Sequence, residues 1–213
     1  MGNLRLDIHP EHPQPRKVQR VVETLHAGGI AAYPTDSVYA LGCAIESRKA
    51  AAALYRAKQL SPKQGLALLV PSLSAASDYG RFTLGAYRLA KRIFPGPFVL
   101  VVPATSDVPR NLLDKKRRTV GLRISSHPIV KAIVEGLGRP VLTTTAQLPG
   151  EVEPLNDPED VSEAFGHVID VMVHGGTTGL QPTTVLEVDA SDETHVNVLR
   201  EGCGSLEGLW VND

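Results

Sequence analysis

Apolar residues recur with two different periods along this chain. Over residues 16–27 they return every three or four positions, from Val18 to Leu25, and two glycines then end the pattern. Residues 30–33 follow as a short run that is apolar on both faces, which is typical of a buried strand. The pattern therefore predicts a helix that leads directly into a buried strand.

Similar patterns continue through the chain. Predicted strands occupy residues 4–8, 30–33, 66–70, 98–102, 119–124, 141–145, 168–173, 184–188 and 196–200. Predicted helices occupy residues 16–27, 47–58, 128–137 and 158–165, and two further helical patterns lie between residues 71 and 94. Ser47 is the expected N-cap of the second helix, a serine at 125 or 126 is the expected cap before Pro128, and Leu84 is expected to point inward.

Helices and strands alternate through most of this order, which predicts an α/β protein with a mixed sheet at its C-terminal end. The sequence shows neither internal repeats nor a low-complexity linker. Its 213 residues suit one domain with a sizeable core, so we expect a single domain spanning residues 1–213.

The charges of the chain nearly cancel, with 22 basic residues against 23 acidic residues. No global field therefore favours nucleic acid or a membrane surface, and a contact with a polyanion needs a local basic patch. No apolar run approaches the ~20 residues of a membrane span, and the N-terminus lacks the pattern of a signal peptide. We therefore expect a cytoplasmic protein that does not enter a membrane.

The two cysteines, Cys43 and Cys203, form no CxxC pair and have no zinc-site spacing. Each lies beside a glycine in a predicted site loop, so the two thiols can be close in space. The preferred interpretation is two small, partly buried thiols without a disulfide. The seven histidines are scattered, and no metal site is expected.

Polar residues cluster where the predicted strands begin or end. These clusters are residues 35–37, 123–125, 143–147, 183–184 and 200–202. If the strands run mostly in parallel, the clusters gather at one edge of the sheet, where such folds bind ligands. The helix over residues 47–58 would bring Lys58 to the same edge. Hydroxyl groups with the cations Lys58, Arg123 and Arg200 suit a phosphate-bearing ligand.

Several other site classes lack their sequence signals. There is no G-x-S-x-G elbow for a serine hydrolase and no H-E-x-x-H zinc motif. The Walker A and G-x-G-x-x-G motifs are also absent, which argues against an ordinary P-loop or Rossmann site.

Each candidate residue also has a structural interpretation. Thr35 and Thr145 can be turn or cap hydroxyls, and the two arginines can form structural ion pairs. His127, just before a proline at a helix start, fits a capping or packing role better than catalysis. The basic run Lys115, Lys116, Arg117 and Arg118 can be a solvated surface or a grip for an RNA backbone.

Four motifs, in order along the chain, resemble those of the YrdC/YciO family. Residues 34–42 read P-T-D-S-V-Y-A-L-G and resemble P-T-D-T-V-Y-G-L-G, and residues 123–128 read R-I-S-S-H-P and resemble R-x-P-x-H-P. Residues 182–185 read P-T-T-V and resemble P-S-T-V, and residues 199–202 read L-R-E-G and resemble L-R-x-G. The resemblance extends over roughly residues 14–205, nearly the whole chain.

The resemblance implies a twisted, open mixed α/β sheet with helices on its faces and a concave, positively charged groove. It also implies a nucleotidyltransferase of the threonylcarbamoyl-AMP synthase type. Such an enzyme joins L-threonine, bicarbonate and ATP with Mg²⁺, and releases pyrophosphate, in the first step of a transfer RNA modification. By motif, the threonine-binding residues would be Thr35, Arg123 and Thr183. The nucleotide-binding residues would be Lys58, Thr143, Thr145 and Arg200, with Lys58 as the catalytic cation.

Two motifs depart from the synthases and look like the YciO branch of the family. The synthases carry K-x-R, whereas here Lys58 is followed two residues later by Leu60. They also carry T-S-A-N-x-S-G, whereas residues 144–150 read T-T-A-Q-L-P-G. The loss of one arginine fork to phosphate lowers a rate on the order of a hundredfold. Weak or altered activity is therefore expected, and binding of double-stranded RNA or transfer RNA without efficient catalysis is the alternative.

Overall fold

The computed structural model describes residues 3–60, 66–113, 118–188 and 196–209. Its strands are β1 (Leu4–Asp7), β2 (Ile30–Tyr33), β3 (Ala40–Ala44), β4 (Ala67–Leu69), β5 (Phe98–Pro103), β6 (Thr119–Arg123), β7 (Val141–Thr145), β8 (Val171–His174), β9 (Thr184–Val188) and β10 (Val196–Arg200). Its α-helices are α1 (Pro15–His26), α2 (Arg48–Ala57), α3 (Leu73–Tyr79), α4 (Leu84–Ile93), α5 (Pro128–Leu137) and α6 (Pro158–Phe165). A short 3-10 helix, η1, covers Arg110–Leu112.

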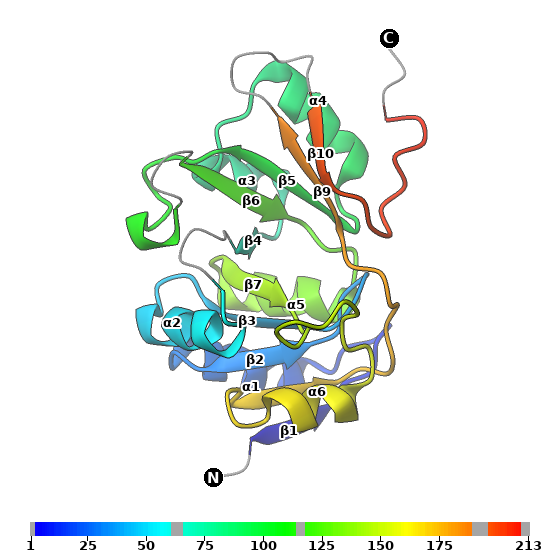
Figure 1. Cartoon of the computed structure of the whole chain (residues 1–213). Coiled ribbons are helices and arrows are strands. Elements are labelled where there is room, and N and C mark those ends of the chain that lie inside the picture. Colours follow the sequence, from blue (N-terminus) through cyan, green and yellow to red (C-terminus); the bar gives the residue numbers. More distant parts are fainter. Residues whose placement is uncertain (1–2, 61–65, 114–117, 189–195, 210–213) are drawn as a thin grey trace.

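All ten strands join one open sheet in the order β1-β8-β2-β3-β7-β4-β6-β5-β9-β10 (Figure 1). Parallel pairing occurs between β1 and β8, β2 and β8, β4 and β6, and β5 and β9, while the other neighbours are antiparallel. The expected mixed α/β sheet is confirmed. The condition of mostly parallel strands is not met, because antiparallel pairs run through the middle of the sheet and not only through its C-terminal end.

The loop after β2 leads into a strand, not into a helix. Strand β3 pairs antiparallel with β2, from Ile30 opposite Cys43 to Tyr33 opposite Ala40. The sequence of β3 is short, small and free of β-branched residues, so it carries little strand signal of its own. Gly42 is required there, since a Cβ at this position would lie 2.4 Å from the Tyr33 hydroxyl.

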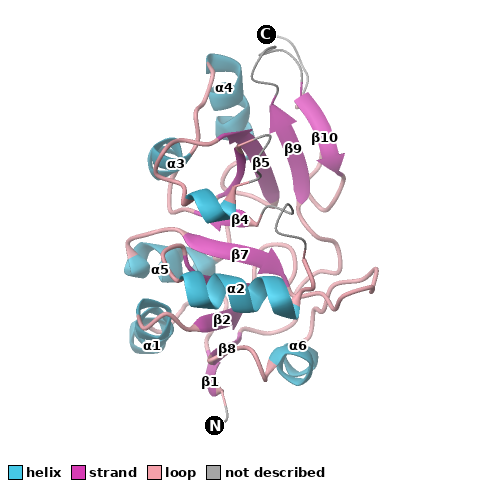
Figure 2. Ribbon diagram, turned by 60° about the vertical axis from the view of Figure 1, so that its left-hand side comes forward, coloured by secondary structure: helices cyan, strands magenta, loops and turns pink. Residues whose placement is uncertain are grey.

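The helices cover the sheet through two core clusters. One cluster packs α1 and α5 against β1, β2 and β8, and the other brings together residues of α2, α3, α4 and α6. Figure 2 shows α3 and α4 with the strands at one end of the sheet, and α1, α2, α5 and α6 around the other end. The expectation of one domain over residues 1–213 stays a prediction. Within the described residues, no helix is both long enough and apolar enough to cross a membrane.

Helix starts test the expected capping residues. Ser47 is the N-cap of α2, since its hydroxyl accepts a hydrogen bond from the Ala50 amide at 3.4 Å, and this prediction is confirmed. The expected serine cap of α5 is wrong, because His127 takes that position and its Nδ1 accepts from the Ile129 amide at 3.2 Å. Leu84 is 63% exposed at the start of α4, so the inward position expected for it is also wrong.

Candidate functional site

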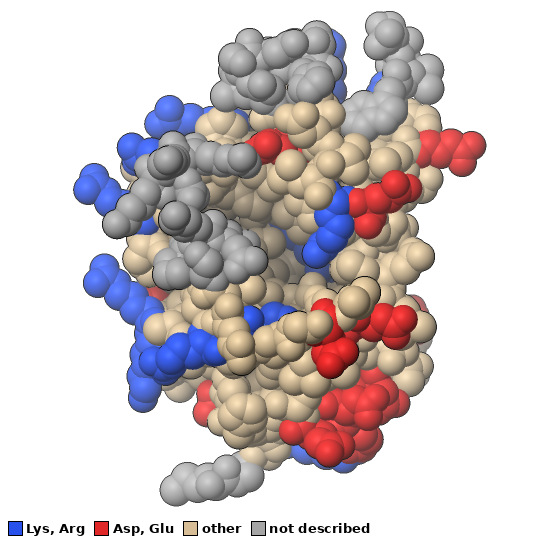
Figure 3. Space-filling view, viewed as in Figure 1, with Lys and Arg blue, Asp and Glu red and all other residues tan. Residues whose placement is uncertain are grey.

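A cavity of about 480 Å³ opens between the two ends of the sheet (Figure 3). This volume is in the range of small-molecule sites. Its floor is built by small and aliphatic side chains from neighbouring strands: Ala67, Val99, Val101, Gly121 and Val185. Gly121 pairs with Ala67 on one side and with Val101 on the other, so these residues form one row across three strands. This row gives the cavity an apolar lining.

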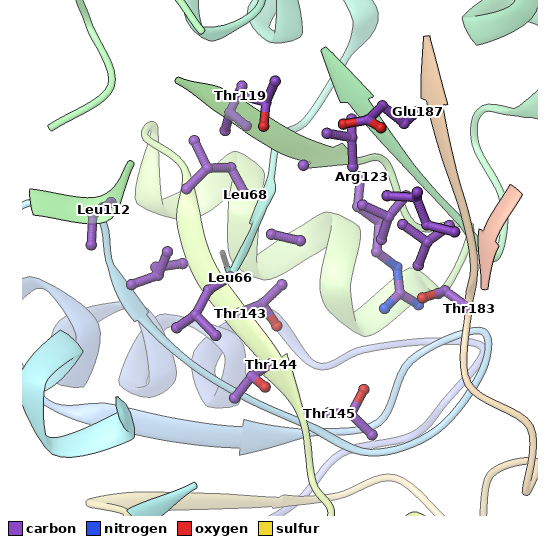
Figure 4. Close-up of a pocket in the computed structure, with 18 of the residues that line it drawn as sticks. Leu66, Leu68, Leu112, Thr119, Arg123, Thr143, Thr144, Thr145, Thr183 and Glu187 are labelled. Carbon is purple, nitrogen blue, oxygen red and sulfur yellow. The ribbon is translucent and has the colours of Figure 1, made fainter. Parts of the chain in front are cut away.

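Arg123, the last residue of β6, lies at the polar end of this cavity (Figure 4). The residue is only 6% exposed. Its Nη2 donates to Thr35 Oγ1 at 3.0 Å and to Ser37 Oγ at 3.0 Å, and it forms an ion pair with Asp36 Oδ1 at 2.5 Å. Its Nε is buried without a hydrogen-bond partner among the described residues. Arg123 therefore joins the cavity to the loop after β2.

Asp36 lies in the predicted polar cluster 35–37, but the sequence pattern assigned it no role of its own. Besides Arg123, its carboxylate accepts from Ser125 Oγ at 2.8 Å, from the Ser126 amide at 2.8 Å and from Ser126 Oγ at 3.0 Å. Burial alone would raise the pKa of Asp36, but the charge of Arg123 and these hydrogen bonds lower the pKa below its usual value. The carboxylate is therefore ionised at neutral pH.

Thr35 is 3% exposed, and its hydroxyl is engaged on several sides. Oγ1 donates to the Val38 carbonyl at 2.6 Å, accepts from the Ser37 amide at 3.2 Å and accepts from Arg123. Thr35 thus closes a turn and also accepts a hydrogen bond from Arg123. Its structural role and its place in the site do not exclude each other.

Arg200, the last residue of β10, lies beside Thr183 at the same end of the cavity. Its Nε donates to the Thr183 carbonyl at 3.0 Å, and its Nη2 donates to Thr183 Oγ1 at 2.9 Å. Partial burial lowers the pKa of Arg200, and the nearby charge of Arg123 lowers it further. Two neighbouring guanidinium groups at one end of a cavity favour the binding of an anion there.

The threonine hydroxyls of β7 differ in their surroundings. Thr143 is buried, and its hydroxyl lies 2.9 Å from the Tyr33 hydroxyl and donates to the Leu41 carbonyl at 3.3 Å. Thr145 is half-buried, and Figure 4 shows its hydroxyl on the cavity side. The hydroxyl of Thr145 is thus directed to the cavity, whereas the hydroxyl of Thr143 has partners in β2 and β3.

Lys58 follows the last turn of α2 and is buried, with its Nζ bonded to the Gln147 carbonyl. Burial lowers the pKa of Lys58 to about 8. The side chain of Gln147 turns away and donates to the carbonyls of Glu151 and Val152, at 2.7 and 3.0 Å. Lys58 therefore lies beside the loop that follows β7, not in the wall of the cavity.

The remaining predictions are placed as follows. Lys115, Lys116 and Arg117 lie outside the described residues, while Arg118 is exposed. Cys43 is buried in β3 and Cys203 is exposed, and both are free thiols. Burial raises the pKa of Cys43 to about 12. No group of three or more histidine, cysteine or acidic residues in the described parts of the chain could hold a metal ion.

A second cavity, of about 430 Å³, lies beside the loop after β2. It is lined by Thr35, Asp36, Ser37, Gly179, Leu180, Gln181 and Cys203. Of the predicted residues, Arg123, Thr183 and Arg200 line the first cavity and Thr35 lines the second. The hydrogen bond from Arg123 to Thr35 links the two groups. Arg123 and Thr35 meet although β6 and β2 are not neighbours in the sheet.

Comparison with known proteins identifies the family of the chain. The family model described as "Telomere recombination", that of the Sua5/YciO/YrdC proteins, matches residues 23–202. The chain is 41% identical over 200 residues to the uncharacterized protein YciO of Escherichia coli K12, covering 94% of this chain and 96% of that protein. It is 30% identical over 171 residues to the threonylcarbamoyl-AMP synthase of Serratia proteamaculans, covering 79% and 89%.

Solved structures agree with the sequence relationship. The crystal structure of Escherichia coli YciO matches with a TM-score of 0.91 at 39% identity, over 96% of this chain and 98% of that one. The crystal structure of P. abyssi Sua5 complexed with L-threonine matches with a TM-score of 0.85 at 26% identity. That match covers 94% of this chain and 58% of Sua5. The chain therefore belongs to the Sua5/YciO/YrdC family.

Proposed function

We propose that this protein condenses L-threonine, bicarbonate and ATP into threonylcarbamoyl-AMP and pyrophosphate. The observation that carries the proposal is the meeting of Arg123, Thr35, Thr183 and Arg200 at the end of a cavity of suitable size. The threonine-bound Sua5 neighbour and the threonylcarbamoyl-AMP synthase relative support the choice of substrates. We place the reaction in the cytoplasm, where its product would be used in the modification of transfer RNA.

The reaction needs positioned cations more than a protein nucleophile. The threonine amine and bicarbonate give a carbamate and water, and a carbamate oxygen then attacks the α-phosphorus of ATP while pyrophosphate leaves. Negative charge develops on the phosphoryl oxygens, so catalysis rests on electrostatic stabilisation. Magnesium enters with the nucleotide as MgATP and neutralises phosphate charge when bound.

Each end of the site has its own part in this scheme. Arg123 and Thr183 would bind the threonine carboxylate. Thr35 would orient Arg123 by accepting its hydrogen bond. Arg200, which lies beside Thr183, and Thr145 would contact the nucleotide phosphates. Lys58, whose pKa is about 8, is mostly protonated at pH 7 and would act as a cation once its contact with the Gln147 carbonyl opens.

Pyrophosphate release tests this proposal. We expect release from the wild-type protein only when ATP, threonine and bicarbonate are all present, and a higher melting temperature with ATP and threonine together. Lys58→Ala is expected to lower the release at least tenfold without loss of the fold, because a phosphate-binding cation is removed. Lys49→Ala, an exposed lysine on the same helix, is the matched control and should behave like the wild type. A wild-type protein that forms neither pyrophosphate nor a threonine-dependent adenylate would disprove the proposal.

RNA binding is the second candidate, and a surface feature favours it. Arg48, Lys49 and Arg56 of α2 and also Arg118 are exposed, and Figure 3 shows basic side chains gathered along one side of the molecule. Replacing Lys115, Lys116, Arg117 and Arg118 by glutamine is expected to weaken binding of a structured RNA and to flatten its salt dependence. Gel-shift titrations at 50 and 200 mM salt measure both effects, and unchanged binding would contradict this function.

A further inference from the structure

Asp36 connects two parts of the molecule that are distant in the sequence. It belongs to the loop between β2 and β3, and its four hydrogen-bond donors come from Arg123, Ser125 and Ser126. Oδ1 accepts from Arg123 and Ser125, and Oδ2 accepts from the amide and the hydroxyl of Ser126. Both carboxylate oxygens are therefore used by the turn that joins β6 to α5.

These contacts determine how Arg123 is oriented. One corner of the guanidinium, Nη2, meets Thr35, Asp36 and Ser37, while Nε is buried without a partner among the described residues. A buried donor without a partner costs free energy. Another interaction must therefore stabilise this orientation of Arg123. The strong, charged contact with Asp36 supplies the opposing free energy.

The orientation leaves one part of the guanidinium for a ligand. In the part of the chain that the structure describes, Nη1 makes no hydrogen bond, and Figure 4 shows the guanidinium directed toward Thr183. A planar guanidinium recognises a carboxylate only when its free edge faces it, so a rotated Arg123 would lose this contact.

We propose that Asp36 is a positioning residue for the amino-acid substrate. It fixes Arg123 in the orientation that presents Nη1 to the substrate carboxylate, and it does not contact the substrate carboxylate itself. This inference rests on the proposed function, because it takes threonine as the ligand of Arg123. The hydrogen-bond partners of Asp36 are Arg123, Ser125 and Ser126, and do not include Lys58 or Thr145, so we expect nucleotide binding to be insensitive to this residue.

Threonine binding to the full-length protein, measured by titration calorimetry without ATP, tests the inference. Asp36→Asn keeps the shape of the side chain but loses its charge and two acceptor positions. We expect the threonine dissociation constant to rise on the order of 10- to 100-fold, and the ATP dissociation constant to change less than about twofold. Asp160→Asn, an exposed carboxylate of α6, is the matched control and should change neither value.

A double-mutant cycle separates positioning from a general loss of structure. Asp36→Asn should have no further effect on threonine binding in an Arg123→Gln background, because Asp36 acts through Arg123. That double variant has no unpaired buried charge, so we expect it to fold even if Asp36→Asn alone does not. Equal weakening of threonine and ATP binding, or an additive effect in the double variant, overturns the inference. Threonine binding without pyrophosphate release in the wild type would instead disprove only the proposed reaction, and absence of threonine binding would disprove both.

Discussion

Arg123→Met is expected to lower the free energy of unfolding by about 3 kcal/mol at pH 7. Methionine fills most of the same space, so the main loss is electrostatic. The variant leaves the Asp36 carboxylate with its Ser125 and Ser126 donors but without its cation, in a site that is shielded from water. Removing one member of a buried ion pair is among the most damaging single changes in a protein.

The loss of unfolding free energy in Arg123→Met should depend on pH, and the direction of this dependence shows whether Asp36 causes it. In the wild type the pKa of Asp36 is lowered, so its contribution to stability is present above the unfolded value of about 3.9 and is lost as the pH falls. In Arg123→Met, burial should dominate and raise the folded pKa above the unfolded one. The destabilisation is then present at pH 7 and is relieved as the pH falls through that raised value. The difference between the two proteins should therefore shrink from pH 7 to pH 4.

Urea unfolding at pH 7, 5.5 and 4 measures this difference. The double variant Arg123→Met with Asp36→Asn has no buried charge at either position, so it should be more stable than Arg123→Met at pH 7. Its difference from Arg123→Met should shrink at pH 4, where the carboxylate of the single variant is protonated. A difference between Arg123→Met and the wild type that stays constant over this range would show that the effect comes from packing and not from the ion pair.

The helices and most strands could be predicted because their side-chain periods are strong. Val18 to Leu25 form the buried face of α1, and residues 30–33 are buried along the whole of β2. Strand β3 was missed because Ala40–Ala44 contains only small or unbranched residues, and its place depends on pairing with β2 and β7. Strand pairing over long sequence distances is a tertiary property that no local pattern carries.

The candidate site shows the same division. Hydroxyls and cations at strand ends were recognised, and Arg123 does contact Thr35 across 88 positions of sequence. The role of Asp36 was missed because a lone acid between two hydroxyls looks like a turn residue. The orientation of Thr143 was also not predictable. Thr143 pairs with Gly42 of β3, and the Tyr33 hydroxyl reaches Thr143 over this glycine because it has no side chain.

The two ends of the site differ in how completely they are assembled. At the amino-acid end, Arg123, Asp36 and Thr35 form a connected network of short contacts. At the nucleotide end, Lys58 is bonded to the Gln147 carbonyl, and the side chain of Gln147 stabilises its own loop. Leu60, two residues after Lys58, packs partly buried against the core cluster that contains α2. This end thus offers a phosphate fewer donors than the motifs of the synthases would.

Leu60→Arg combined with Gln147→Asn is therefore expected to raise threonine-dependent pyrophosphate release on the order of a hundredfold. The arginine restores the K-x-R pattern and adds a fork that matches phosphate oxygens. Asparagine is one methylene shorter than glutamine, so it cannot donate hydrogen bonds to both the Glu151 and the Val152 carbonyls. The loop beside Lys58 then loses the hydrogen bonds that stabilise it. A coupled pyrophosphate assay at saturating threonine and bicarbonate measures the gain as a function of ATP concentration.

Leu60→Gln combined with Gln147→Asn is the matched control, because glutamine is polar and of similar length but carries no charge. It should give little of the gain, and Leu60→Lys with Gln147→Asn should give an intermediate gain, since lysine supplies the charge without the fork. If all three pairs raise the rate equally, release of the loop and not phosphate binding limits the reaction. If none does, the weak end of the site lies elsewhere, and the threonine end built around Arg123 serves a reaction other than adenylate formation.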